Sequence, residues 1–158
     1  MKTQNLTCVS YLCDRYDKDK KLVPKDVKEK IKVMQWVHAS EATFALHALA
    51  ILYARMTMKD APEEVLQTAE QRMSVNVQND MSWLESELSL AQGPFLIGEH
   101  PTAADIAMHF SATFIIGKEL GTNGKQWPNI EKWLKACENT EGYKRAVKKT
   151  GHNLNHKY

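Results

Sequence analysis

The chain has few cysteines, the residues that cross-link small domains through disulfides or metal ions. It contains three cysteines among 158 residues, Cys8, Cys13 and Cys137, and no C-x-x-C pair. An odd number of cysteines without metal-ligand spacing favours reduced thiols over a disulfide framework or a zinc site. Hydrophobic residues make up 43% and charged residues 25%, which argues against disorder.

A strong net charge and a long hydrophobic run are also lacking. The 21 Lys and Arg residues against 19 Asp and Glu residues give a net charge of +2, and no nucleic-acid motif is present, so we expect no nucleic-acid partner. The longest apolar stretch, residues 42–54, is about 13 residues long and contains His47, too short and polar to span a bilayer. Residues 1–7 are polar and resemble no secretory leader. We therefore expect a cytoplasmic protein without a membrane partner.

The sequence has only weak metal-ligand patterns and no segment that marks a domain boundary. His152 and His156 have helical spacing, but they follow Gly151 in a polar tail with no third ligand, so no metal site is predicted. A chain of 158 residues can bury a single core. We therefore predict one domain over residues 1–158, with a tail at 152–158.

The spacing of apolar residues predicts helices throughout. A helix of about 30 residues should follow Pro24 and run over residues 25–56. A second should begin at Glu63 and end before Gly93. A third, over residues 103–120, is apolar on nearly every side, as expected of a central helix.

Two short helices, one starting at Pro128 and one ending near Thr150, complete the pattern. No segment has the alternation of a β-strand. The predicted fold is an all-α bundle of about five to six helices.

Residues 94–110, PFLIGEHPTAADIAMHF, contain the start of the central helix. Thr102 can cap the exposed N–H groups of the first turn, and Asp105 can reach back to the Thr102 amide and complement the helix dipole. We predict that both are structural capping residues, and that replacing Asp105 costs about 1 kcal/mol or more.

This string resembles the start of the core helix in the C-terminal, all-helical domain of cytosolic glutathione S-transferases. QWVHASEATFALHALAILYAR, residues 35–55, resembles the first long helix of that domain, and WPNIEKWLKACENTEGYKRAV, residues 127–147, resembles its closing helix pair. The three sequence segments most resemble those of fungal members of the family. The resemblance covers residues 11–151 and implies a helical bundle over 18–151.

A complete transferase of this family also has a thioredoxin-like domain that binds glutathione and carries the catalytic Tyr, Ser or Cys. Residues 1–17 resemble only the last helix of that domain, through CVSYLCDRYD at 8–17. Gln4 and Asn5 stand where the family usually has Glu-Ser for the γ-glutamyl group. The resemblance therefore argues against glutathione binding, and no other cofactor is predicted.

One stripe of the first long helix could line a pocket. Projection at about 100° per residue places six side chains on or beside it: Trp36, Ser40, Thr43, Phe44, His47 and Ile51. Such a wall suits an apolar small molecule, and the resemblance implies that this helix lines the electrophile site. The imidazole of His47 suits proton transfer near neutral pH, so we predict a catalytic role for it. Packing on neighbouring helices or a second subunit would produce the same stripe.

His38 and Glu41 lie three residues apart and are adjacent on the same helix. A carboxylate beside an imidazole can form an acid–base pair, which makes both residues candidate catalytic groups. A structural ion pair or a two-fold interface between subunits would also place them together. His109, on the central helix, is predicted to be a core residue with an internal partner.

Three functional hypotheses follow. The first is a glutathione-independent enzyme of specialised metabolism, similar to glutathione S-transferases, that isomerises, cleaves by elimination or cyclises an apolar metabolite. The second is a non-catalytic interaction module. The third is a transferase fragment that needs a thioredoxin-fold partner. Helix surface uncovered by the missing half should find a partner, so we also expect a homodimer.

Overall fold

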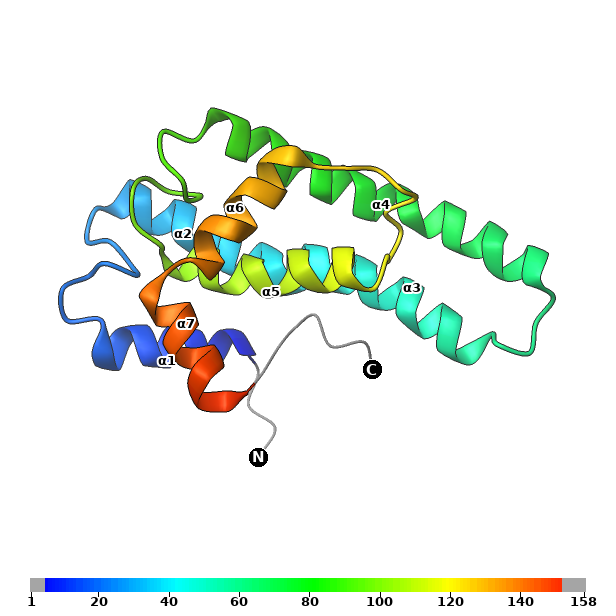
Figure 1. The fold of residues 1–158 in the computed structure, drawn as a ribbon, viewed down its shortest axis with the longest axis horizontal. Helices are drawn as coiled ribbons and strands as arrows, with labels where there is room; N and C mark the ends of the chain where they lie inside the picture. The colour runs from blue at the N-terminus through cyan, green and yellow to red at the C-terminus, as the bar shows by residue number, and fades with distance from the viewer. Residues whose placement is uncertain (1–4, 152–158) are drawn as a thin grey trace.

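Every regular element of the computed structural model, which describes residues 5–151, is a helix (Figure 1). The elements in chain order are α1 (Asn5–Tyr16), α2 (Val27–Ala39), the π-helical segment η1 (Ser40–Ala45), α3 (Leu46–Thr57), α4 (Glu63–Leu90), α5 (Ala103–Gly117), α6 (Pro128–Glu138) and α7 (Glu141–Thr150). Because α2, η1 and α3 follow one another without a gap, the described residues form six helical rods. The predicted all-α bundle of five to six helices is confirmed.

The first long helix begins slightly later than predicted because its N-cap is Asp26. The Asp26 carboxylate accepts a hydrogen bond from the Glu29 backbone N–H at 3.0 Å, which satisfies one of the unpaired donors of the first turn. Pro24 lies in the loop before this cap. The rod ends at Thr57, one residue beyond the predicted range.

The π-helical segment changes which residues of this rod face the core. A π turn contains more residues than an α turn, so side chains four apart stay on one face. The buried residues of the rod are Val33, Trp36, Val37, Ala39, Ser40, Phe44, Ala48 and Ile51. Ala48, and not His47, therefore lies in the core.

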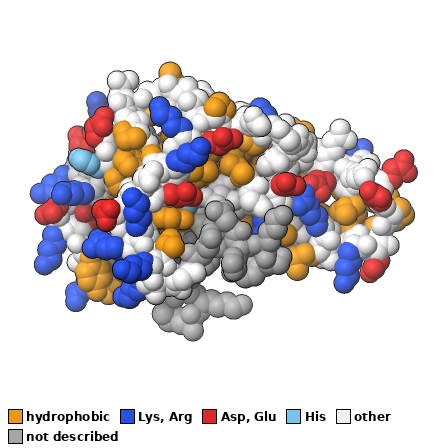
Figure 2. All heavy atoms as spheres, viewed as in Figure 1, with side chains coloured by type: hydrophobic (Ala, Val, Ile, Leu, Met, Phe, Trp, Pro, Cys, Tyr) orange, Lys and Arg blue, Asp and Glu red, His pale blue; other side chains and the backbone are white. Residues whose placement is uncertain are grey.

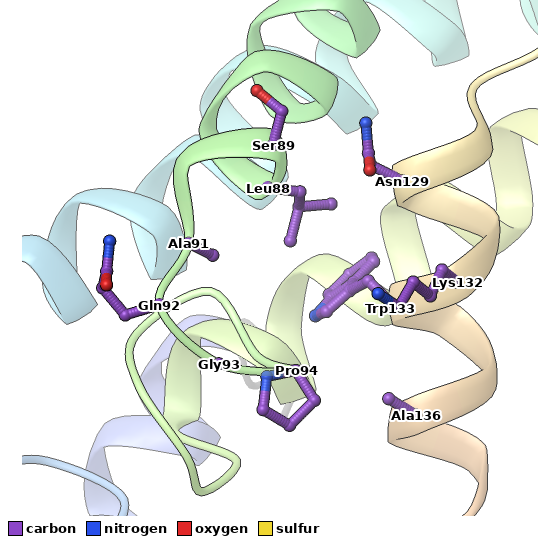
Figure 3. A pocket seen from close by; sticks show the side chains of 10 residues that line it. All are labelled: Leu88, Ser89, Ala91, Gln92, Gly93, Pro94, Asn129, Lys132, Trp133 and Ala136. Atoms are coloured by element: carbon purple, nitrogen blue, oxygen red, sulfur yellow. The ribbon is translucent and has the colours of Figure 1, made fainter.

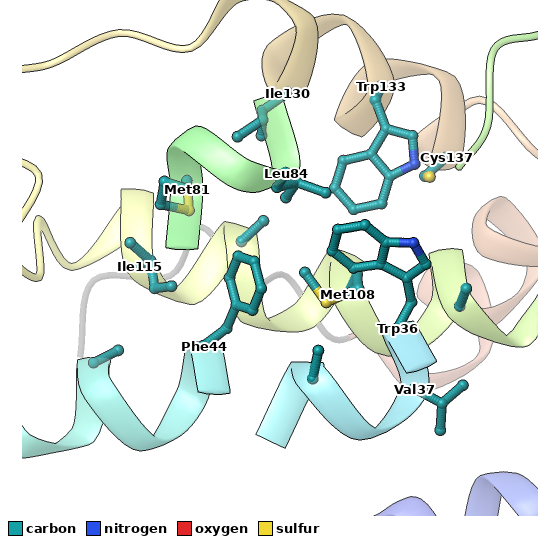
Figure 4. Packing of buried hydrophobic residues seen from close by; sticks show 14 of the residues in the cluster. Trp36, Val37, Phe44, Met81, Leu84, Met108, Ile115, Ile130, Trp133 and Cys137 are labelled. Carbon is teal, nitrogen blue, oxygen red and sulfur yellow. The ribbon is translucent and has the colours of Figure 1, made fainter. Parts of the chain in front are cut away.

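The central helix is α5, and nine of its 15 residues are buried. It packs on α2, η1 and α6. Figure 4 shows side chains from α2, η1, α4 and α6 around Met108 and Ile115 of α5. The sequence pattern that was apolar on nearly every side reflects this enclosure.

Asp105 joins three parts of the bundle. Its carboxylate accepts hydrogen bonds from the backbone N–H and hydroxyl of Thr102 at 2.8 and 2.9 Å, which completes a capping box. It also accepts from the backbone N–H of Leu96 and from Nε1 of Trp133, both at 2.9 Å. The Asp105 residue is 1% exposed, so the carboxylate is a buried junction between the 91–102 loop, α5 and α6.

Two more charged side chains fix the position of α4. The Glu85 carboxylate accepts from the backbone N–H groups of Asn129 at 3.0 Å and Ile130 at 2.9 Å, and so caps the start of α6. Arg55 of α3 pairs with Glu70 of α4. These contacts hold α4 against both α3 and α6.

The surface is mixed in character. Figure 2 shows hydrophobic side chains in separate patches among charged ones on the face in view. Within residues 5–151 no helix is long and apolar enough to cross a membrane, and no group of three metal-ligating side chains occurs. The predicted tail at 152–158, with His152 and His156, lies outside the described residues.

Candidate functional site along α4

Three aromatic side chains meet between the first long rod and α4. The ring of Trp36 stacks on that of Trp83, with centroids 4.3 Å apart and an interplanar angle of 21°. Phe44 lies 6.0 Å from Trp83 and 6.3 Å from Trp36. Trp36 is 5% exposed and Phe44 is fully buried, whereas Trp83 is half-buried. Trp83 is therefore the ring of the cluster with the largest share of its surface open.

A cavity of about 520 Å³ opens beside this aromatic cluster. It lies between α2, the end of α4 and the segment that follows α4. The lining residues are Glu29, Lys32, Gln35, Trp36, Trp83, Glu87, Leu90, Ala91, Gln92, Leu96, Ile97 and Gly98. Of the predicted substrate-binding residues, only Trp36 lines it. The volume is within the range of small-molecule sites.

His47 of α3 contacts Asp80 of α4. His47 Nδ1 lies 2.6 Å from Asp80 Oδ2, and the two side chains are 32% and 11% exposed. Asp80 precedes Trp83 by three residues, which is about 4.5 Å of helix rise. The pair and the cavity are therefore successive features along α4.

The pairing prepares His47 for proton transfer. An ionised carboxylate only accepts hydrogen bonds, so Nδ1 carries the proton and Nε2 is left as the basic nitrogen. Burial raises the pKa of the Asp80 carboxyl, and the hydrogen bond and charge of His47 act in the opposite direction. Such an oriented imidazole can accept a proton from a bound molecule and return it elsewhere.

The other residues of the predicted stripe lie at different depths. Ser40 is 2% exposed, and its hydroxyl donates to the Val37 carbonyl at 2.7 Å. Ile51 is fully buried, like Phe44. Thr43 is half-buried. The structure thus brings Trp36, Ser40 and Phe44 together in the core and places His47 at its edge, so the substrate-binding roles of the enclosed residues remain predictions.

His38 and Glu41 occupy a different face of the first rod. His38 is exposed and Glu41 is half-buried. Within the described part of the chain, neither side chain has a hydrogen bond or ion pair with the other. Their predicted acid–base role is untested, and the structure does not join them to the His47–Asp80 pair.

Sequence reasoning missed Asp80 and Trp83. Both lie on the inward side of α4, since Val77, Met81 and Leu84 around them are buried. A carboxylate at position 80, inside a stripe of apolar residues, was the available signal for a partnered acidic group. Its partner was not predictable, because His47 is 33 residues away in sequence.

A second cavity, of about 480 Å³, lies on the other side of the segment after α4 (Figure 3). Leu88 and Trp133 point toward it, and Lys132 and Asn129 of α6 stand at its edge. None of the predicted site residues lines it.

His109 is buried, as predicted, and is 6% exposed. Its internal partner is Glu138: His109 Nε2 lies 3.6 Å from Glu138 Oε1, which is an ion-pair distance but too long for a hydrogen bond. Burial lowers the pKa of His109, and Glu138 acts in the opposite direction. The ring contacts Tyr143 edge-on at 5.2 Å, so its environment is aromatic.

The fold is that of an all-helical domain built around one capped central helix. A solved structure of a glutathione S-transferase from Actinobacillus pleuropneumoniae shares it, with a TM-score of 0.72 and 24% identity, over 97% of this chain and 66% of that one. At this identity the similarity establishes the fold alone.

The family model for the glutathione S-transferase C-terminal domain matches residues 44–141, which are 98 of the 158 residues. The chain therefore belongs to the glutathione S-transferase C-terminal domain family. This confirms the resemblance noted in the sequence.

Two fungal relatives agree with this assignment. The chain is 23% identical over 143 residues to the glutathione S-transferase-like protein OpS6 of Beauveria bassiana, covering 88% of this chain and 63% of the relative. It is 27% identical over 138 residues to glutathione S-transferase aclG of Aspergillus oryzae, covering 82% and 57%. The chain thus spans less than two thirds of the length of these relatives.

Proposed function

We propose that this chain acts on an apolar small molecule as a glutathione S-transferase-like enzyme of specialised metabolism. The reaction class is isomerisation, elimination or ring closure. The substrate occupies the cavity beside the first long rod, and its reacting carbon is placed next to His47. The cellular setting of this proposal is the cytoplasm.

The observation that carries the proposal is the His47–Asp80 pair at 2.6 Å, in which Asp80 lies about one helical turn along α4 from Trp83. Asp80 keeps the imidazole in one tautomer, and Nε2 removes a proton from the substrate. The resulting imidazolium is stabilised by the Asp80 carboxylate and returns the proton at a second position of the substrate or to the leaving group. Apolar walls strengthen this electrostatic interaction by excluding water.

These reactions need no thiol, so the proposal includes independence from glutathione. In an isomerisation the proton that His47 removes from the substrate returns to another position of the same substrate, so no co-reactant is consumed. In an elimination the proton passes to the departing group. One oriented base and a shaped apolar wall are sufficient for both.

Native mass spectrometry followed by a turnover assay tests the proposal. The chain is incubated with a fungal metabolite extract, and the retained compound is identified and then followed by chromatography with and without glutathione. We expect retention and conversion in both samples. Conversion that requires glutathione, or retention of a polypeptide only, would contradict the proposal.

A matched pair of variants assigns the base. His47→Gln should lower kcat at least about 100-fold, in line with the loss of a general base, while the metabolite is still retained. His38→Gln is the control, because His38 is exposed on another face of the same rod. Equal turnover by His47→Gln and the unaltered chain would remove His47 from the mechanism, and loss in both variants would place the chemistry on the predicted His38–Glu41 pair.

A second candidate, glutathione conjugation with a thioredoxin-fold half, is favoured by the outer face of α5. Ile106 and Phe110 are 53% and 45% exposed, and Phe110 stacks on Phe114 with ring centroids 6.0 Å apart. An apolar surface of this kind is suited to a covering domain. If this second candidate is right, the metabolite will be converted in the same assay only when glutathione and a thioredoxin-fold domain are both added.

The proposal also includes a homodimer. Leu46, Tyr53 and Met56 on α3 are each more than half exposed, at 59%, 57% and 61%. Burial of these side chains against a second copy would remove apolar surface from water. Light scattering after size exclusion should give twice the mass of the chain, and a monomer at every concentration would refute the dimer.

A further inference from the structure

The cavity beside Trp36 and Trp83 has an apolar interior and a charged rim. Its inner wall contains the stacked indoles together with Leu96 and Ile97, which are half-buried. The half-buried Trp83 offers part of its ring system to a ligand. A planar aromatic group can stack there, because offset stacking on an indole adds to the gain from burial.

The rim carries two carboxylates and one ammonium group. Glu29 and Lys32 come from α2, and Glu87 comes from α4. All three are exposed, and within the described residues none of their side chains has a hydrogen bond or ion pair. The charges at the entrance are therefore available to a ligand, with an excess of one negative charge.

The indole faces favour the same sign of ligand charge as the rim. An aromatic ring attracts a cation above its face, and tryptophan does so most strongly. A carboxylate on each side of the entrance adds a second attraction for a positive group. Lys32 repels a positive group, but the two carboxylates of Glu29 and Glu87 outweigh this single positive charge.

We infer that this cavity selects an aromatic amine: a planar aromatic body stacked on Trp83, with a protonated amino group at the Glu29–Glu87 rim. The inference rests on the proposed function, because it assigns the substrate class to the same cavity.

Calorimetric titration of the 158-residue chain with three matched probes tests the inference. The probes are 2-(naphthalen-1-yl)ethylamine, the corresponding alcohol and naphthalen-1-ylacetate, which share one ring system and differ in charge. We expect the amine to bind roughly threefold to tenfold more tightly than the alcohol, as a partly solvated cation–π contact and rim charges allow. The acetate should bind most weakly.

Variants separate the ring from the rim. Trp83→Leu should weaken all three probes, whereas Glu87→Gln should remove most of the amine preference and leave the affinity of the alcohol unchanged. Glu99→Gln is the matched control, because Glu99 is exposed and does not line the cavity. Thermal unfolding of each variant checks that the fold is retained.

The outcomes distinguish this inference from the proposed function. Equal binding of amine and alcohol, or tightest binding of the acetate, would overturn the selection for amines while leaving an apolar ligand site in place. The same holds if Glu87→Gln keeps the amine preference. Absence of binding by all three probes would overturn the inference and remove the cavity from the proposed function as well.

Discussion

Two aspartates of this chain differ in what surrounds them, although both lie on helix faces turned toward the bundle. Asp105 accepts hydrogen bonds from four neutral donors and is 1% exposed. Among residues 5–151, Asp80 has one hydrogen-bond partner, the imidazole of His47, and its side chain is 11% exposed. The first carboxylate joins elements of the fold, and the second orients a single titratable ring.

The difference shows how a buried acid can be told apart as structural or chemical. Donors from two other segments, the 91–102 loop and α6, converge on Asp105, so its removal leaves several buried polar groups without partners. Removal of Asp80 leaves only one half-buried imidazole, which water can reach. Function is therefore expected where the partner of a carboxylate can itself change protonation.

The largest effect should come from Asp105→Ala. The N–H groups of Leu96 and Thr102 and the indole of Trp133 would all lose their acceptor, so we expect a loss of roughly 3 kcal/mol or more in the free energy of unfolding. Urea denaturation measures it. Asp26→Ala, which removes an exposed cap, is the control and should cost about 1 kcal/mol. Equal losses would mean that Asp105 is no more than a cap.

Trp133→Phe tests one bond of the junction. The phenyl ring keeps much of the bulk but cannot donate to Asp105, so we expect a loss of about 1–2 kcal/mol in unfolding free energy. Trp127→Phe is the matched control, because Trp127 is 3% exposed and its Nε1 has no hydrogen-bond partner in the described structure. A larger loss at Trp127 would show that ring volume, and not the hydrogen bond, determines the cost.

The third effect concerns pH and His109, a buried ring on the same helix as Asp105. Because burial lowers its pKa, the unfolded chain binds more protons than the folded chain from about pH 6.5 downward. Stability from this group is therefore complete above that pH and falls as pH decreases, by at most about 1.4 kcal/mol per unit. Unfolding midpoints between pH 7 and 5 should fall less in His109→Gln, and identical slopes would exclude His109.

The smallest stability effect should come from Asp80→Asn, below about 1 kcal/mol. The amide oxygen can still accept from His47, but the charge that stabilises an imidazolium is lost. Because burial raises the pKa of Asp80, the folded chain binds a proton at this carboxyl more readily than the unfolded chain does. The unaltered chain therefore loses stability as pH rises above about 3.9, the pKa of an unperturbed aspartate. The variant should lack this pH dependence. Turnover should fall at least tenfold in the variant, whereas unchanged turnover would make the pair structural.

The helices were predictable because their signals are local. The capped start at Thr102 and the proline at the start of α6 were read from neighbouring residues. The π-helical segment was not, because no local residue marks it, and the extra residue in its turn moved His47 off the predicted stripe. The predicted site depended on the register of this rod. In the structure Trp36 lines the cavity, whereas Ile51 is buried in the core.

The sequence by itself determined the all-helical class, the boundaries of most helices and the family, since periodicity, caps and motif wording depend on residues close together in the chain. The tertiary structure alone decided that Asp80 meets His47 and that Trp83 stacks on Trp36. Those pairs join α4 to a rod more than 30 residues earlier. Their contact depends on how two helices rotate and cross, which is set by packing across the whole core and by no single segment.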